Sequence, residues 1–131
     1  MVVAVCIETP TRFARYTVSN ATAIPLHTTM ALIDPHACVA TSTAAQPFAG
    51  FAWEEKTASD GLTEITVAKN GVWDITDCTA GGTVGAMVVV SGANLIRDAV
   101  AGDLLTGAIV GKREETASAA EVTRIRAGDI S

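Results

Sequence analysis

The side chains that most often bind metals occur together at one place in the sequence. His36-Ala37-Cys38, with His27 upstream, brings imidazole and thiol groups into a short stretch. On a β-strand, residues two apart point to the same side, so His36 and Cys38 would face one space. A zinc site takes three or four protein ligands, and no other residue has the spacing to complete one. We therefore expect a structural role for these side chains and no bound metal.

Nucleophilic catalysis would require a thiol or hydroxyl group activated by a base. Cys6, Cys38 and Cys78 are the thiol candidates, and His27 or His36 would have to be the base. No Gly-x-Ser-x-Gly motif marks a catalytic serine. The pattern gives no support to a nucleophile and base pair.

Two further patterns contain residue types that occur in enzymes. Gly107 and Gly111 precede a basic pair, as in phosphate-binding loops, but three residues rather than four separate them. Arg113 also stands where such a loop needs the Ser or Thr that binds magnesium. The acidic pairs at 54–55 and 114–115 are neighbours in sequence, so on strands their carboxylates would point to opposite faces. The sequence thus predicts no enzyme, no catalytic residue and no cofactor.

The length and composition indicate one small domain. At 131 residues, with 49% hydrophobic residues, the chain is long enough to bury a core. Aromatic residues are only 5%, so this core should be mainly aliphatic. Nine Lys and Arg against 14 Asp and Glu give a net charge of −5. This charge argues against a nucleic-acid partner, because phosphate binding needs a basic face.

The cysteines and apolar runs indicate a soluble protein of a reducing compartment. Three cysteines without paired spacing predict buried free thiols rather than disulfides. No run approaches the roughly 18 apolar residues of a membrane span. The apolar start at Val2–Ile7 lacks a basic region before it and is too short for a signal peptide. We expect no membrane partner.

The middle of the chain has the clearest strand signals. Residues 62–68 and 72–77 both alternate between apolar and polar side chains, with Trp73 and Ile75 on one face of the second run. Asn70-Gly71 lies between the two runs. Asn-Gly in this position is the strongest short signal for a β-hairpin, because a type I′ turn needs positive φ at both central residues. The sequence predicts that the two runs pair as a hairpin.

Strand signals recur along the rest of the chain, and no stretch has helical periodicity over three turns. They occur at Val2–Ile7, Phe13–Val18, Met30–Ile33, Ala37–Thr41, Phe48–Trp53, Ala86–Val90, Asn94–Arg97, Gly107–Arg113 and Glu121–Arg126. This spacing predicts an all-β fold, a small single-domain barrel or sandwich with short strands, long loops and an extended N-terminal segment. We expect residues 1–23 to form an N-terminal strand or arm and residues 24–131 to form the β-barrel-like domain.

Five groups of segments give the chain a family resemblance. In order, they are Thr29–Pro35, Phe48–Lys56, Asp60-Gly61 with Gly71–Asp74, Ser91–Ile96 and Gly107–Gly111. The ordered set, which lies between Ile24 and Arg126, resembles the small head decoration (cement) proteins of tailed viruses of bacteria or archaea. These proteins are all-β and lack enzymatic residues.

The resemblance implies a virion structural protein, made in the host cytoplasm, that binds the major capsid protein on the outer surface of the icosahedral head. It implies self-association, commonly as a homotrimer, that stabilises the shell. The segment before Ile24 lies outside the matched region, and we expect it to reach the capsid or a neighbouring subunit by adding a strand to an exposed edge. The candidate contact residues are Val3, Val5, Ile7, Phe13 and Tyr16.

Two alternatives stay open at this point. The first is another virion structural β module, such as a tail or fibre-base domain, because composition does not separate it from a head protein. The second and weaker alternative is a small metal-binding domain that uses His27, His36 and Cys38.

Overall fold

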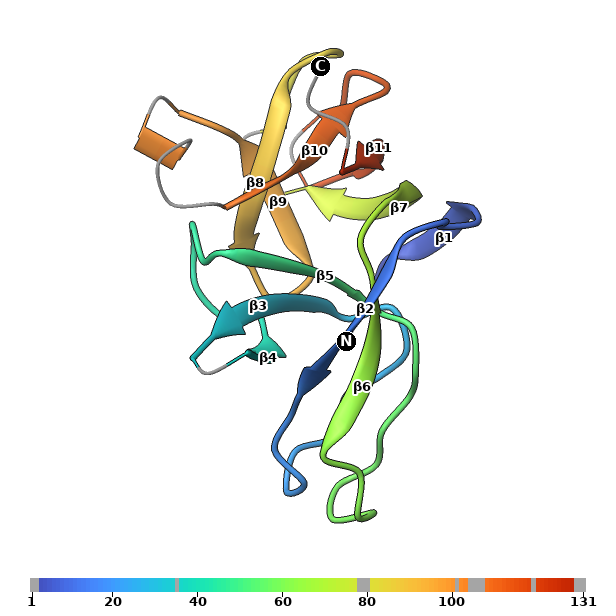
Figure 1. Ribbon diagram of the computed structural model, residues 1–131. Helices are drawn as coiled ribbons and strands as arrows, with labels where there is room; N and C mark the ends of the chain where they lie inside the picture. Colours follow the sequence, from blue (N-terminus) through green and yellow to red (C-terminus); the bar gives the residue numbers. More distant parts are fainter. Residues whose placement is uncertain are drawn as a thin grey trace.

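The computed structural model describes residues 3–34, 36–77, 81–100, 102–103, 108–118 and 120–128. These residues are all-β, as the sequence predicts, and hold eleven strands and no α-helix. Each stretch with a strand signal overlaps one of the strands, with ends that differ by up to three residues (Figure 1). The strands are β1 (Val5–Glu8), β2 (Phe13–Thr17), β3 (Thr29–Ile33), β4 (Ala37–Ala40), β5 (Phe48–Ala52), β6 (Glu64–Ala68), β7 (Gly71–Asp77), β8 (Met87–Gly92), β9 (Leu95–Asp98), β10 (Ile109–Arg113) and β11 (Val122–Ala127).

The second half of the chain forms one closed ring of strands, the C-terminal ring. Its order is β7-β11-β10-β8-β9, and β9 returns to pair with β7 in parallel, with Thr76 opposite Leu95. The first strand of the chain joins this ring from outside. β1 pairs with the beginning of β7 in antiparallel orientation and places Cys6 opposite Trp73.

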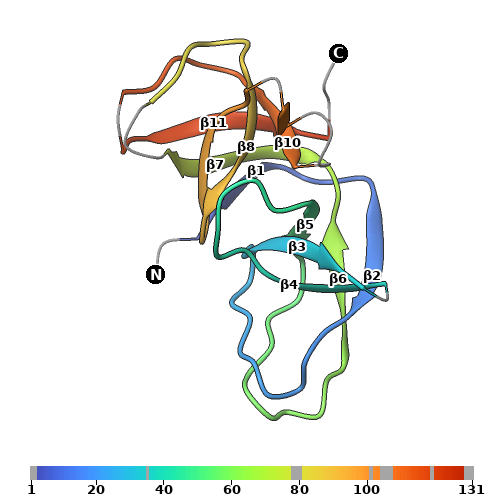
Figure 2. The same ribbon diagram turned by 90° about the vertical axis from the view of Figure 1, so that its left-hand side faces the viewer.

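The other strands form a second closed barrel, the N-terminal ring, in the order β2-β4-β3-β5-β6. Its seam is narrow, because β2 and β4 meet in parallel at the single pair Thr17 and Ala37. Figure 2 shows the two rings one above the other, with the chain from β1 to β2 running down one side. The first 23 residues therefore supply a strand to each ring, and the domain boundary after residue 23 stays a prediction.

Each ring has an apolar interior that follows from alternation along its strands. In the C-terminal ring, Trp73 and Ile75 of β7 are fully buried against residues of the neighbouring strands, so both lie on one face as predicted. The N-terminal ring buries a smaller core that includes Met30, Ile65 and Val67. The rings thus have separate interiors within one chain.

A shared junction joins the two rings. The ring of Phe51, on β5, stacks on that of Trp73, on β7, with centroids 4.0 Å apart and planes 15° apart. Beside this stack, the buried Thr29 amide donates to Asn94 Oδ1 at 3.0 Å, and the Thr41 hydroxyl donates to the Gly92 carbonyl at 2.9 Å. Because buried polar groups are costly when unpaired, this network fixes how the rings meet.

The hairpin predicted at Asn70-Gly71 is wrong. β6 pairs with β2 and β5, whereas β7 pairs with β1, β9 and β11, so the two strands belong to different rings. Gly71 has a φ of +109°, and a Cβ there would lie 2.9 Å from the Glu8 carbonyl oxygen. Asn70-Gly71 therefore connects β6 of one ring to β7 of the other. The absence of a side chain at Gly71 lets the N-terminal segment approach closely.

Two buried cations lie near the ends of the rings. In the C-terminal ring, the fully buried Arg113 pairs with the buried carboxylate of Asp77 and with Asp98 at 2.7 Å. In the N-terminal ring, the Lys56 ammonium is fully buried and donates to the Asn20 carbonyl at 2.6 Å. Burial of a charge is tolerated only with such partners, so both residues have structural roles.

Candidate interaction surface

β1 presents an exposed apolar strip on the C-terminal ring. Val5 is 57% exposed and Ile7 is 41% exposed, while Ala4 and Cys6 face the core. β1 pairs with β7 along one edge, and the described residues place no strand along its other edge. Unprotected edges of this kind accept strands from other chains. The strip is therefore a candidate contact surface.

A second exposed apolar feature lies at the beginning of β2, on the N-terminal ring. Phe13 is 45% exposed and rests against Trp53 at a centroid distance of 5.7 Å. The backbone just before it is clamped by Asn70, whose Oδ1 accepts the Thr11 and Arg12 amides at 2.9 and 3.1 Å. We call Arg12 and Phe13 the Phe13 corner. Its backbone is fixed before any partner binds.

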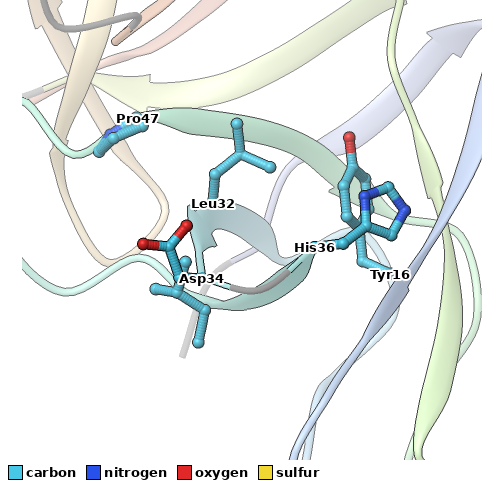
Figure 3. Close-up of a pocket in the computed structure, with 6 residues that line it drawn as sticks. Tyr16, Leu32, Asp34, His36 and Pro47 are labelled. Carbon is cyan, nitrogen blue, oxygen red and sulfur yellow. The ribbon is translucent and has the colours of Figure 1, made fainter.

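A cavity of about 560 Å³ opens beside the turn between β3 and β4, next to β2 and to the residue before β5. We call it the β3–β4 cavity. Figure 3 shows the Tyr16 and His36 rings together at one end, Leu32 between the ends, and Pro47 and Asp34 at the other. The lining residues are Tyr16, Leu32, Ile33, Asp34, His36 and Pro47. Leu32 and Ile33 are both exposed, so two adjacent aliphatic side chains border this cavity and make it a candidate place for contact.

Tyr16 lies at the wall between this cavity and the interior of the N-terminal ring. Lys69 Nζ donates to Tyr16 Oη at 2.6 Å and to the Ala49 carbonyl at 2.7 Å, and it also lies 4.9 Å from the centre of the Tyr16 ring. The His36 ring packs against the same tyrosine at 4.9 Å and its Nε2 bonds the Arg15 carbonyl at 3.1 Å. Tyr16 is thus held rigidly from both sides.

The three residues considered for a metal site do not form one. His27 lies at the junction, with its ring 5.4 Å from Trp53 and 5.0 Å from Trp73. His36 is on the cavity wall, and Cys38 is buried inside the N-terminal ring. Both histidines have positive φ, 69° and 52°, a conformation in which histidine is enriched and which explains their place in turns.

Burial governs the ionisation of these groups. It lowers the pKa of His27, and a hydrogen bond to the Ala4 backbone partly opposes this effect. It raises the pKa of the Cys38 thiol to about 11, although the nearby charge of Lys69 acts in the other direction. Cys6 is a free thiol and its pKa is likewise raised by burial. Cys78 lies outside the described residues. Neither described cysteine has the depressed pKa of a reactive thiol.

The structure brings some of the predicted contact residues together and separates others. Val5 and Ile7 share the β1 strip, with Val3 half-buried just before it. Phe13 is exposed on the N-terminal ring, whereas Tyr16 is largely buried and reaches the surface through the cavity. Their role in contacts stays a prediction. Sequence reasoning missed the cavity itself, whose only local signal is the apolar pair Leu32-Ile33 immediately before a turn.

Comparison of the chain with protein-family models and with curated proteins finds no match. Across the described residues, no group of three or more His, Cys, Asp or Glu side chains could hold a metal ion. No helix in that part of the chain is long and apolar enough to cross a membrane.

Proposed function

We propose that the chain is a head decoration protein, which binds the major capsid protein on the outer surface of an icosahedral viral head and stabilises the shell. The observation that carries this proposal is where the resemblance segments lie. Thr29, Phe51, Trp73 and Asn94 come from four of these segments, and they meet at the junction between the rings. Four of the resemblance segments thus each contribute a residue to one junction, which supports a common architecture.

The exposed surfaces support a role in contact. The β1 strip and the Phe13 corner offer apolar side chains on a chain whose cores are already closed. A small subunit that repeats over a shell needs only weak binding per copy, because many contacts act together in register. Self-association as a homotrimer fits sites where several capsid subunits meet, since closed oligomers of identical chains are symmetric. No enzymatic step is part of this proposal.

The test is a binding experiment with heads that lack the protein. Purified chain is mixed with such heads, and bound copies are counted by electron microscopy together with the resistance of the heads to heat. We expect saturable binding to the shell and greater resistance. Binding to isolated tails instead, or no binding to heads, would overturn the proposal and favour a tail or fibre-base module.

Point variants refine this test better than truncation, because removal of residues 5–8 also removes a strand from the C-terminal ring. The double variant V5D/I7D keeps the β1 backbone but places charge on its strip. Val122→Asp is a matched control, since Val122 is 57% exposed on β11 of the same ring. We expect V5D/I7D to reduce head occupancy and V122D to leave it unchanged.

A further inference from the structure

Phe13 is an exposed aromatic side chain, and the β3–β4 cavity has aliphatic side chains on part of its wall. Among the described residues, Phe13 is the one aromatic side chain in the set of exposed large hydrophobic groups. The cavity of about 560 Å³ is lined by Leu32, Ile33 and Pro47 together with Tyr16, His36 and Asp34, and its volume is ample for an aromatic ring with its flanking chain. An aromatic side chain that fills a cavity of mixed aliphatic and polar lining is a common interface anchor.

Charge strengthens the match. Arg12 precedes Phe13, and its guanidinium forms no ion pair with any described residue. Asp34 lies at the cavity end, and its carboxylate likewise has no hydrogen-bonded or ionic partner in the described ranges. By contrast, the neighbouring Arg15 is already paired with Glu54 at 3.0 Å. Arg12 and Asp34 have opposite charges and no ionic partner among the described residues. Arg12 adjoins Phe13, and Asp34 lines the β3–β4 cavity.

Contacts within the chain hold the backbone of the corner and one side chain of the cavity wall. Asn70 and β6 fix the backbone of the corner, with Phe13 paired opposite Ala68. The Lys69 hydrogen bond and the His36 ring fix Tyr16 at the cavity. Binding between preorganised surfaces loses less conformational entropy, so less of the contact energy is spent on ordering these groups.

We propose that the Phe13 corner of one copy docks in the β3–β4 cavity of a second copy, with Arg12 of the first copy paired to Asp34 of the second. The corner and the cavity are different surfaces, so each copy uses one of each, and such a head-to-tail contact gives a trimer when its rotation closes the ring after three copies. This inference names the two surfaces through which copies of the chain would associate. It rests on the proposed function only for the statement that the assembly is a trimer. The docking itself needs no viral head.

The test measures oligomeric mass of the purified chain over a range of concentrations. Wild-type protein is expected to associate, and Phe13→Ala to weaken the association constant by roughly 10- to 100-fold, as for an interface anchor. Arg12→Glu and Asp34→Arg should each weaken it, because each creates a like-charge contact. The double variant R12E/D34R should restore association, since it exchanges the two charges. Val122→Ala is the matched control for loss of an exposed apolar side chain and should leave the mass unchanged.

The charge exchange separates docking from a folding defect. The variants R12E, D34R and R12E/D34R alter exposed side chains only, and their thermal unfolding can be compared directly with that of the wild type. A wild-type chain that stays monomeric at every concentration would overturn the inference. So would variants at Phe13, Arg12 and Asp34 that keep the wild-type mass, or a double variant no better than its parents. Oligomers that form but do not bind heads would overturn the proposed function and leave the docking intact.

Discussion

Gly71 offers a sharp test of how the N-terminal segment is held against the C-terminal ring. Substitution by alanine introduces two separate costs. The φ of +109° strains any residue with a Cβ, and the new Cβ would lie 2.9 Å from the Glu8 carbonyl oxygen and 3.1 Å from Trp73 Nε1. Backbone strain costs about 1–2 kcal/mol, and displacement of β1 by the added methyl group adds roughly 1–2 kcal/mol more.

Gly61 separates these two costs. Its φ is +90°, but a Cβ there would meet nothing within 4 Å, so Gly61→Ala measures strain without the clash. Urea unfolding of both variants should give a Gly71→Ala loss about 1–2 kcal/mol larger than that of Gly61→Ala. Hydrogen exchange should locate the extra loss in β1. Equal losses in the two variants, with β1 amides protected as in the wild type, would refute the close approach described here.

Three further predictions concern buried groups. Arg113→Met should lower the free energy of unfolding by about 3–5 kcal/mol, because it removes the cation that pairs with the buried carboxylate of Asp77. Urea unfolding measures this loss, and a value below about 1 kcal/mol would contradict the prediction. Because burial lowers the pKa of His27, the unfolded chain binds more protons below its ordinary pKa of about 6.5, so stability should fall as pH drops through that value. His27→Asn, which tolerates positive φ, should flatten this pH dependence, and an unchanged slope would exclude His27 as its source. With a pKa of about 11 and a buried thiol, Cys38 should resist alkylation at pH 8 until urea unfolds the chain, and rapid labelling of native protein would contradict its placement.

Local patterns predicted most of the strands, because alternation and turn residues act over a few positions. Trp73 and Ile75 show this well, since their burial follows from the period of one strand. The pattern at Asn70-Gly71 misled for the same reason. It reports a permissive backbone, and nothing in the local sequence shows that the strands on either side pair with distant partners in two different rings.

Ring closure was also beyond local reasoning. The parallel contacts of β9 with β7, and of β2 with β4, depend on side-chain packing across the whole fold rather than on either strand alone. The cavity follows from the second of these contacts, because Tyr16 and His36 come together only where the N-terminal ring closes. Alternation placed Phe13 and Tyr16 on opposite faces of one strand without showing which face is outside, and of the two candidates only Phe13 is exposed.

The place of β1 has a consequence for the order of folding during synthesis. The strands of the N-terminal ring, residues 13–68, leave the ribosome as one continuous block and can pair with each other at once. β1 is made before all of them, yet the strand with which it pairs among the described residues, β7, is made after them. We therefore expect β1 to dock on β7 after the N-terminal ring has closed, and to lack this partner on the nascent chain until then.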